Sequence, residues 1–232
     1  MEMDQLKMWE GDFGKAYTWR NTIDWRTRVP AFQKMLEGLS IEGLLEVGCN
    51  RGHNLIALSH LLADPRVIVG IEPNNVALDL ARKASDKVKV LPASAFALPF
   101  KECCFDLVFT AGVLIHIPLP QLPNAISEIY RVSSRYILAI EYYAEQETAL
   151  PYRGYDNFLW KRDFLKHYEE RFSDLRLIRS GFWGLEDGFD QTQWWLLEKG
   201  FGSKRDDCCA REGAGAGILC GDRFRELLKE PR

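Results

Sequence analysis

The segment LLEVGCNRGHN, residues 44–54, decides the fold that the rest of the sequence supports. Its apolar first half is typical of a buried strand, and glycines at positions 48 and 52 mark a sharp turn into a helix. Glycines in such a turn let a ligand approach backbone N–H groups that a Cβ atom would obstruct. A pyrophosphate-binding loop has the spacing G-x-G-x-x-G, whereas Asn50 stands where its second glycine would be. The loop therefore predicts a ligand without a pyrophosphate.

Outward from this turn, short β-rich runs alternate with helical patterns. We expect strands near residues 44–47, 67–71, 88–91, 105–110, 136–141, 175–180 and 193–198. Helices are expected near residues 54–62, 75–83, 120–131 and 162–171. This alternation predicts an α/β fold with helices on both faces of a mostly parallel, seven-stranded sheet. The last two strands are joined by a short stretch without a helical pattern, so we expect the last strand to be antiparallel.

The composition excludes several classes of protein. The 232 residues are 47% hydrophobic with a net charge of −3, which argues against disorder and against binding nucleic acid or anionic lipid through charge alone. No apolar run reaches the roughly 18 residues of a membrane span, and the acidic, polar start is unlike a signal peptide. We therefore expect a cytoplasmic protein that acts on a small molecule, without a nucleic-acid or membrane partner.

Cysteine and histidine positions predict no metal site. The six cysteines, at positions 49, 103, 104, 208, 209 and 220, lack the CxxC pairs that hold zinc, and we expect free thiols. His53 and His60 could share a helix face, but two imidazoles without a further ligand rarely bind a metal.

An acidic residue follows the second predicted strand. Glu72 stands about twenty residues after the glycine turn, at the strand's carboxyl end, where a carboxylate can accept both hydroxyls of a ribose. An exposed Glu in a turn before a helix is the alternative. Ser94 and the Ala95 amide follow the third strand and are placed to meet an adenine edge.

Taken in order, these motifs resemble those of the class I S-adenosylmethionine-dependent methyltransferases. The resemblance rests on Glu46-x-Gly48-x-x-x-Gly52, Glu72, the stretch ASAFALPF and the strand FDLVFTAGVLIHI, and it covers residues 44–141. It implies a Rossmann-like fold and S-adenosyl-L-methionine as cofactor, with S-adenosyl-L-homocysteine as product. The glycine turn would lie along the methionine moiety, Glu72 would hold the ribose, and Ser94 with Ala95 would contact the adenine, although Asp is commoner than Ser94 there. The implied cofactor site also includes Cys49, Asn50, Asn54, Pro73, Thr110, Ala111 and Gly112.

The flanking segments resemble a narrower group. MWEGDFGKAYTWRN, LPNAISEIYRVSSRYILAIEYY, PYRGYDNFLWKRDF and WWLLEK are together similar to methyltransferases associated with pseudaminic acid biosynthesis, across residues 8–199. Membership would imply methylation of a surface-polysaccharide or nonulosonic-acid sugar precursor. The position methylated stays open.

The motifs and the shifts in composition divide the chain into three parts. Residues 1–40 would form a flap and an amphipathic helix, near residues 23–36, over the cofactor site. We expect Tyr17 and Arg20 to close over the cofactor, with Arg20 meeting the methionine carboxylate. Residues 41–199 would form the methyltransferase domain, with a long substrate connection at about 142–162, and residues 200–232 a loosely ordered tail.

Methyl transfer to a sugar hydroxyl is helped by a base near the mouth over the fourth and fifth strands. His116 is the first candidate, because its ordinary pKa lies near working pH, and bonding a backbone carbonyl is the structural alternative. Glu141 is the second candidate. Tyr142 and Tyr143 suit stacking on a sugar face or core packing.

Cationic and aromatic residues of the long connection suit an anionic acceptor. Tyr152 and Arg153 would contact a carboxylate or phosphate, and an ion pair with Glu145 or Glu147 is the alternative for the cations of this region. Methylation of another carboxylated or phosphorylated metabolite, and S-adenosylmethionine binding without catalysis, stay open. The sequence does not indicate the oligomeric state.

Overall fold

The sheet of the computed structural model, which describes residues 5–62 and 67–200, has the strand order β3-β2-β1-β4-β5-β9-β8. Its strands are β1 (Gly43–Val47), β2 (Val67–Glu72), β3 (Lys89–Pro92), β4 (Phe105–Ala111), β5 (Ser133–Glu141), β8 (Leu175–Trp183) and β9 (Thr192–Lys199). The first five pair in parallel, and β9 is antiparallel to both of its neighbours. The predicted α/β fold, its seven-stranded sheet and its antiparallel last strand are confirmed.

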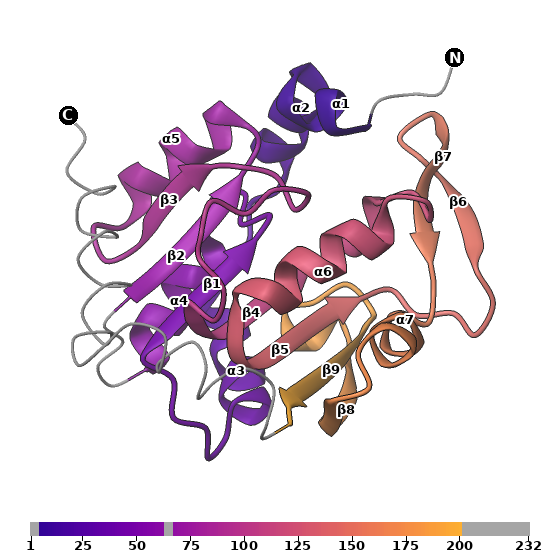
Figure 1. Cartoon of the computed structure of the whole chain (residues 1–232). Coiled ribbons are helices and arrows are strands. Elements are labelled where there is room, and N and C mark those ends of the chain that lie inside the picture. The colour runs from indigo at the N-terminus through magenta and orange to yellow at the C-terminus, as the bar shows by residue number, and fades with distance from the viewer. Residues whose placement is uncertain (1–4, 63–66, 201–232) are drawn as a thin grey trace.

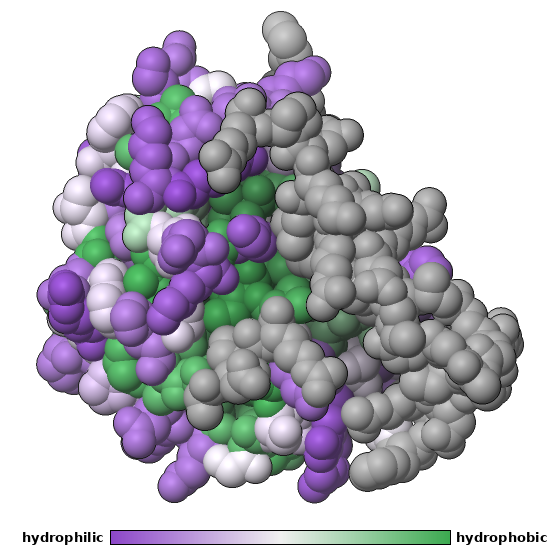
Figure 2. Space-filling view, turned by 90° about the vertical axis from the view of Figure 1, so that its left-hand side faces the viewer, coloured by the Kyte–Doolittle hydropathy of each residue, from purple (hydrophilic) through white to green (hydrophobic). Residues whose placement is uncertain are grey.

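Helices cover both faces of this sheet. Helices α3 (Val29–Met35), α4 (His53–Leu61) and α5 (Asn75–Ala84) share one apolar core with it, and α6 (Leu122–Val132) and α7 (Phe164–Arg171) share the other. The buried side chains of α6 recur at the spacing of one helix face, namely Leu122, Ala125, Ile126, Ile129 and Val132. None of the described helices has the length and apolar character needed to cross a membrane. Figure 2, which looks at one side of the molecule, shows hydrophobic side chains near the middle of that face, with hydrophilic side chains to their left.

The long connection after β5 contains a hairpin that the sequence did not predict. Strands β6 (Thr148–Tyr152) and β7 (Tyr155–Lys161) pair antiparallel, and they are joined by Arg153 (φ 55) and Gly154 (φ 85). Two left-handed residues in succession match the twist of a tight hairpin, although Arg is an uncommon residue there. At the base of the hairpin, Arg162 pairs with Glu147 (Nε to Oε2, 2.5 Å) and donates from Nη1 to Ile117 O at 2.7 Å.

The N-terminal flap is helical, and the helix predicted over 23–36 is shorter than expected. Helices α1 (Gln5–Glu10) and α2 (Asp12–Arg20) come first, and a 3-10 turn, η1 (Trp25–Arg28), precedes α3. The prediction was wrong over the first half of that range because Asp24 caps η1 by accepting from Arg26 N, and Pro30 then starts a new helix.

Figure 1 shows α1, α2 and the β6–β7 hairpin at the same end of the molecule. The two parts touch, because Gln5 Nε2 donates to Asn157 O at 2.9 Å and the Phe13 ring lies 4.7 Å from that of Phe158. The carboxyl ends of the parallel strands lie beneath them. Apart from Gly200, the tail predicted over residues 200–232 lies outside the described residues. The cysteines at positions 208, 209 and 220 belong to it.

Candidate active site

The glycine turn after β1 has the shape that its sequence predicts. Gly48 (φ 75) and Gly52 (φ 74) both adopt the left-handed region, which favours glycine. The N–H groups of Gly48 and Cys49 donate to Ile71 O at 2.9 Å and fix the turn to the neighbouring strand. A Cβ atom on Gly48 would lie 2.6 Å from a Val113 methyl group, so a side chain there would collide with the facing wall.

A chain of hydrogen bonds links the end of β1 to the N-terminal region. Asn54 Nδ2 donates to Glu46 Oε1 at 2.6 Å, and Arg28 Nη1 donates to Asn54 Oδ1 at 2.6 Å. Burial raises the pKa of Glu46 to about 8, although the Asn54 bond and the Arg28 charge act in the opposite direction. The second Glu46 oxygen, Oε2, is buried and has no hydrogen-bond partner among the described residues.

Glu72 lies at the carboxyl end of β2 and receives two backbone hydrogen bonds. Asn50 N donates to Oε2 at 2.9 Å, and Asn74 N donates to Oε1 at 3.0 Å. Burial raises the pKa of Glu72 to about 7, while both N–H bonds lower it. The side-chain amide of Asn50 is buried, and neither its Oδ1 nor its Nδ2 has a partner among the described residues.

Asn74 joins Glu72 to the N-terminal helices. Its Oδ1 atom caps the first turn of α5. Its Nδ2 atom donates to the carbonyl oxygens of Trp9, Glu10 and Gly11 at 2.9 to 3.3 Å. Asn74 is 3% exposed, and its hydrogen bonds hold the N-terminal helices against the end of β2. We call this set of hydrogen bonds the Asn74 clamp.

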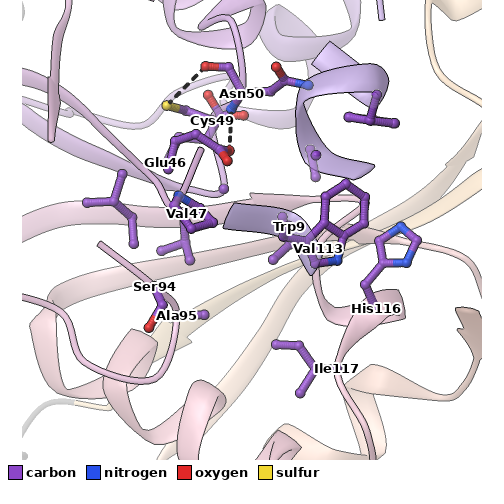
Figure 3. Close-up of a pocket in the computed structure, with 18 of the residues that line it drawn as sticks. Trp9, Glu46, Val47, Cys49, Asn50, Ser94, Ala95, Val113, His116 and Ile117 are labelled. Carbon is purple, nitrogen blue, oxygen red and sulfur yellow. Dashed lines mark hydrogen bonds between the residues drawn. The ribbon is translucent and has the colours of Figure 1, made fainter. Parts of the chain in front are cut away.

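These elements enclose a first cavity between the glycine turn and helices α1 and α2. Figure 3 shows Trp9 next to His116 on one side of it, away from Ser94 and Ala95. The Trp9 ring lies 4.8 Å from the His116 ring and 5.3 Å from the Tyr17 ring. The cavity brings together most of the residues predicted to bind the cofactor, namely Tyr17, Glu46, Gly48, Cys49, Asn50, Asn54, Glu72, Pro73, Ser94, Ala95, Ala111 and Gly112.

A second cavity adjoins the first. It has a volume of about 320 Å³, which is within the usual size of small-molecule sites. Three arginines line it, Arg20, Arg28 and Arg153, together with the side chains Tyr142, Tyr152, Phe189, Asp190 and Thr192. The two cavities share seven lining residues: Tyr17, Asn21, Ile23, Arg28, Ala111, Gly112 and His116. The shared residues form the boundary between the two cavities.

His116 ends the 3-10 turn η2 (Leu114–His116) at this boundary. Its Nδ1 atom lies 2.9 Å from Phe158 O, so Nδ1 carries the proton and donates it, and Nε2 is unprotonated. Burial lowers the pKa of His116 to about 4. The residue is therefore a neutral imidazole. The hydrogen bond to a backbone carbonyl, which the sequence analysis gave as its structural alternative, is present.

Glu141 does not reach either cavity. It is 0% exposed, and its carboxylate accepts from Val113 N at 3.2 Å and Ile115 N at 3.3 Å. Burial raises its pKa to about 7, and the backbone N–H groups of Val113, Leu114 and Ile115 act in the opposite direction. The structure thus contradicts a direct catalytic role, because this carboxylate is sealed beneath the turn that carries His116.

Four further predicted residues do not lie where the sequence placed them. Gly52 is the N-cap of α4, and Thr110 is buried against Glu141; neither lines a cavity. Tyr143 is 45% exposed and packs its ring against Trp195. Arg20 lines the second cavity and not the first, so its predicted contact with the methionine end of a cofactor is not supported.

The structure adds residues that the sequence did not indicate. Arg28 lines both cavities and is the cation nearest to the Glu46 network. Asn74 and Asp190 are also new. Asn74 acts through partners far away in the sequence, and Asp190 lies in the irregular connection before β9. In the part of the chain that the structure describes, no group of three His, Cys, Asp or Glu side chains is placed to hold a metal ion.

Comparisons with known proteins agree with this geometry. The family described as a methyltransferase domain matches residues 44–135. An uncharacterized methyltransferase of Schizosaccharomyces pombe is 31% identical over 48% of this chain and 44% of its own length. The demethylmenaquinone methyltransferase of Lactiplantibacillus plantarum is 35% identical over 38% of this chain and 39% of its own length. The chain thus spans less than half the length of these curated relatives.

Solved structures share the fold. A methyltransferase of Anabaena variabilis described as S-adenosylmethionine-dependent superposes with a TM-score of 0.64 at 15% identity, covering 85% of this chain and 96% of that one. The 1,6-didemethyltoxoflavin-N1-methyltransferase of Burkholderia thailandensis, solved with 1,6-didemethyltoxoflavin and S-adenosylhomocysteine, gives 0.62 at 14% identity, covering 84% and 88%. At such identities the likeness shows the fold alone, which is the Rossmann-like methyltransferase fold.

The first cavity suits the cofactor of this family, S-adenosylmethionine. Glu46 Oε2 and both polar atoms of the Asn50 amide are buried and lack partners within residues 5–62 and 67–200, so a ligand amine, carboxylate or hydroxyl would satisfy them. Glu72 presents a carboxylate where a ribose would lie. The domain match and the cavity together support a methyltransferase domain that uses S-adenosylmethionine.

Proposed function

We propose that this protein transfers the methyl group of S-adenosylmethionine to a hydroxyl of a small anionic acceptor in the second cavity. The observation that carries the proposal is the boundary shared by the two cavities, with three arginines around the second. A surface-polysaccharide or nonulosonic-acid sugar precursor fits this chemistry, because it offers several hydroxyls beside an acid group. The proposal extends the activity of the matched domain to the whole chain.

In the first cavity, different residues would bind different parts of the cofactor. Glu72 would accept the ribose hydroxyls, and Ser94 with Ala95 would contact the adenine. Arg28 and the orphaned atoms of Glu46 and Asn50 would hold the amino and carboxylate groups of the methionine end. The cofactor supplies an activated methyl group on a sulfonium, so the protein's main contribution is alignment, which is worth about 7–11 kcal/mol in favourable cases.

On the acceptor side, cations and rings line the second cavity. Arg153 stands at the hairpin turn and Arg20 at the end of α2, so both sit where an acid group would enter. Arginine binds carboxylate and phosphate through two parallel hydrogen bonds. Tyr142 and Tyr152 offer faces for a sugar ring. The arginines would thus bind the acid group of the acceptor, and the tyrosine rings would orient its sugar ring.

The second cavity bears on two alternative hypotheses about the function. A carboxylated or phosphorylated metabolite that is not a sugar would use the same arginines, so it is an alternative of the same class. The other hypothesis is a protein that binds S-adenosylmethionine without catalysis. An acceptor cavity filled by side chains would favour that hypothesis. The second cavity is open and charged, which favours the enzyme.

Labelled S-adenosylmethionine tests the proposal directly. The protein is incubated with free and nucleotide-linked nonulosonic acids, other nucleotide-linked sugars and small phenolic acids, and label is followed into product. We expect transfer to an acid-bearing member and at least a tenfold loss of it in Arg153→Ala. Absence of transfer across the panel, with S-adenosylmethionine binding intact by calorimetry, would contradict the proposal.

A further inference from the structure

We propose that Tyr142 and Asp190 form the site that receives the acceptor's hydroxyl and takes its proton, an inference that rests on the proposed function. The Tyr142 hydroxyl donates a hydrogen bond to Asp190 Oδ2. Both residues line the second cavity, and Asp190 is the one carboxylate among the described residues that do so. Asp190 is also exposed, so it has a route for returning a proton to water.

Arg28 fixes the position of Asp190. Its Nε atom donates to Gly188 O at 2.8 Å, and its guanidinium lies 4.4 Å from the centre of the Phe189 ring. Gly188 (φ 79) lies so close to Thr27 that a Cβ atom would be 2.6 Å from Oγ1. The chain just before Asp190 is therefore held by the arginine that also contacts the glycine-turn network.

The sheet fixes the position of Tyr142. Gly112 N donates to Ile140 O at 2.9 Å, which ties the boundary between the cavities to the strand end just before Tyr142. Thr192, at the start of β9, lines the same cavity, and its buried hydroxyl has no partner among the described residues. This orphaned hydroxyl gives the acceptor a second hydrogen-bond partner beside the pair.

The proton balance of the reaction gives the pair its role. As the acceptor oxygen bonds to the methyl carbon, the electron pair of the breaking carbon–sulfur bond stays on sulfur. The acceptor's proton moves to the Tyr142 oxygen, and the proton of Tyr142 moves to Asp190. Asp190 is then a neutral acid that releases its proton to solvent. Tyr142 contacts the substrate in this scheme, and Asp190 acts through it.

The surrounding charges favour this route over one through His116. Protonated His116 would be a buried cation, which burial disfavours, and its Nδ1 proton already bonds Phe158 O. Protonation of Asp190 removes a charge instead of creating one. Besides these groups, the charged and titratable side chains around the pair are Lys161, 5.7 Å from the Tyr142 ring, and the cavity-lining Arg20, Arg28, Arg153, Tyr17 and Tyr152. The cations also stabilise a developing oxyanion.

The test compares this pair with a matched pair elsewhere in the chain. Tyr130 donates to Asp174 Oδ2 at 2.7 Å, and neither residue lines a cavity. Single-turnover label transfer to the best acceptor of the panel is measured for Tyr142→Phe, Asp190→Asn, Tyr130→Phe and Asp174→Asn. We expect the first two to lose about 10²–10⁴-fold in rate, as for a lost general base, and the control pair to stay within about threefold of wild type. Calorimetry should show unchanged S-adenosylmethionine affinity in all four.

Two further measurements separate proton transfer from structure. The pH–rate profile of Asp190→Asn should differ from that of the wild type, and Asp190→Glu should recover part of the rate. A wild-type rate and pH profile in Asp190→Asn, or an equal loss in the control pair, would overturn the assignment while leaving the proposed function standing. No transfer by the wild type would overturn the proposed function, and this assignment with it.

Discussion

Arg28 Nη1 donates a hydrogen bond to Asn54 Oδ1 at 2.6 Å and thereby ties the N-terminal region to the helix that follows the glycine turn. The same side chain donates to Gly188 O at 2.8 Å. One arginine thus connects the wall of the first cavity with the connection that carries Asp190. Burial lowers the pKa of Arg28, but the Glu46 carboxylate opposes that shift and the guanidinium stays charged.

Arg28→Ala should weaken S-adenosylmethionine binding by about 10- to 100-fold, the range expected when a charged hydrogen bond worth roughly 1.5–3 kcal/mol is lost. Adenosine lacks the methionine end and should lose little affinity. Arg26→Ala is the matched control, because Arg26 is exposed and its guanidinium contacts the neighbouring Asp24 and Trp25 side chains and lines neither cavity. Equal losses for both ligands in calorimetry would show that Arg28 acts on the fold and not on the methionine end.

The affinity for S-adenosylmethionine should rise with pH. Glu72 accepts the ribose hydroxyls best as a carboxylate, and burial raises its pKa in the empty protein to about 7. A ligand that binds the ionised form gains affinity as pH rises through that pKa, about tenfold between pH 6 and pH 8 for one proton. Titrations of the wild type and Glu72→Gln test this. The variant should bind weakly and should lose the part of the pH dependence that Glu72 causes.

Asn74 should be needed for the N-terminal helices to close the first cavity. Asn74→Asp keeps an oxygen to cap α5 but replaces the donor to three carbonyl oxygens with a carboxylate. We expect faster S-adenosylmethionine dissociation, about tenfold in stopped-flow Trp fluorescence, with the α/β core intact. Asn75→Ala, at an exposed neighbouring position, is the control. A wild-type dissociation rate in Asn74→Asp would show that the clamp does not govern closure.

Glu141 should be a structural residue whose effect on stability depends on pH. Glu141→Ala leaves two buried N–H groups without an acceptor and should lower the free energy of unfolding by about 2–3 kcal/mol. Its folded pKa, about 7, is raised above the ordinary value of 4.5, so ionisation costs stability as pH rises through 7. Glu141→Gln should therefore gain stability relative to wild type between pH 5 and pH 8 in urea denaturation. Exposed Glu145→Gln should show no such trend.

The sheet and much of the first cavity could be predicted from the sequence because their signals are local. Glu46, Gly48 and Glu72 lie at strand ends, where an apolar run stops and a turn begins, and such positions meet at one edge of a parallel sheet. Spacing along the chain is then enough to place them together.

The missed residues depend on contacts that spacing cannot show. Arg28 meets Gly188 across 160 positions, and its role exists only because both segments pack beside the glycine turn. Glu141 is the last residue of β5, a position that often carries a catalytic acid, but its orientation toward the N–H groups of Val113 and Ile115 is decided by the turn above it. The β6–β7 hairpin carries Arg at a left-handed turn position, a weak local signal.

Gly14 offers a test of whether α1 and α2 must pack tightly for cofactor binding. A Cβ atom there would lie 1.9 Å from Trp9 O and 2.9 Å from Asn74 Nδ2, so alanine must push the two helices apart. Alanine is by itself the better helix former, by about 1 kcal/mol, so α2 should persist. We therefore expect Gly14→Ala to lower S-adenosylmethionine affinity at least tenfold while the melting temperature of the α/β core stays nearly unchanged. Gly11→Ala, whose Cβ would lie 3.2 Å from Lys7 O, should have a smaller effect. Wild-type affinity in Gly14→Ala would mean that the cofactor binds without the two helices seated against Asn74.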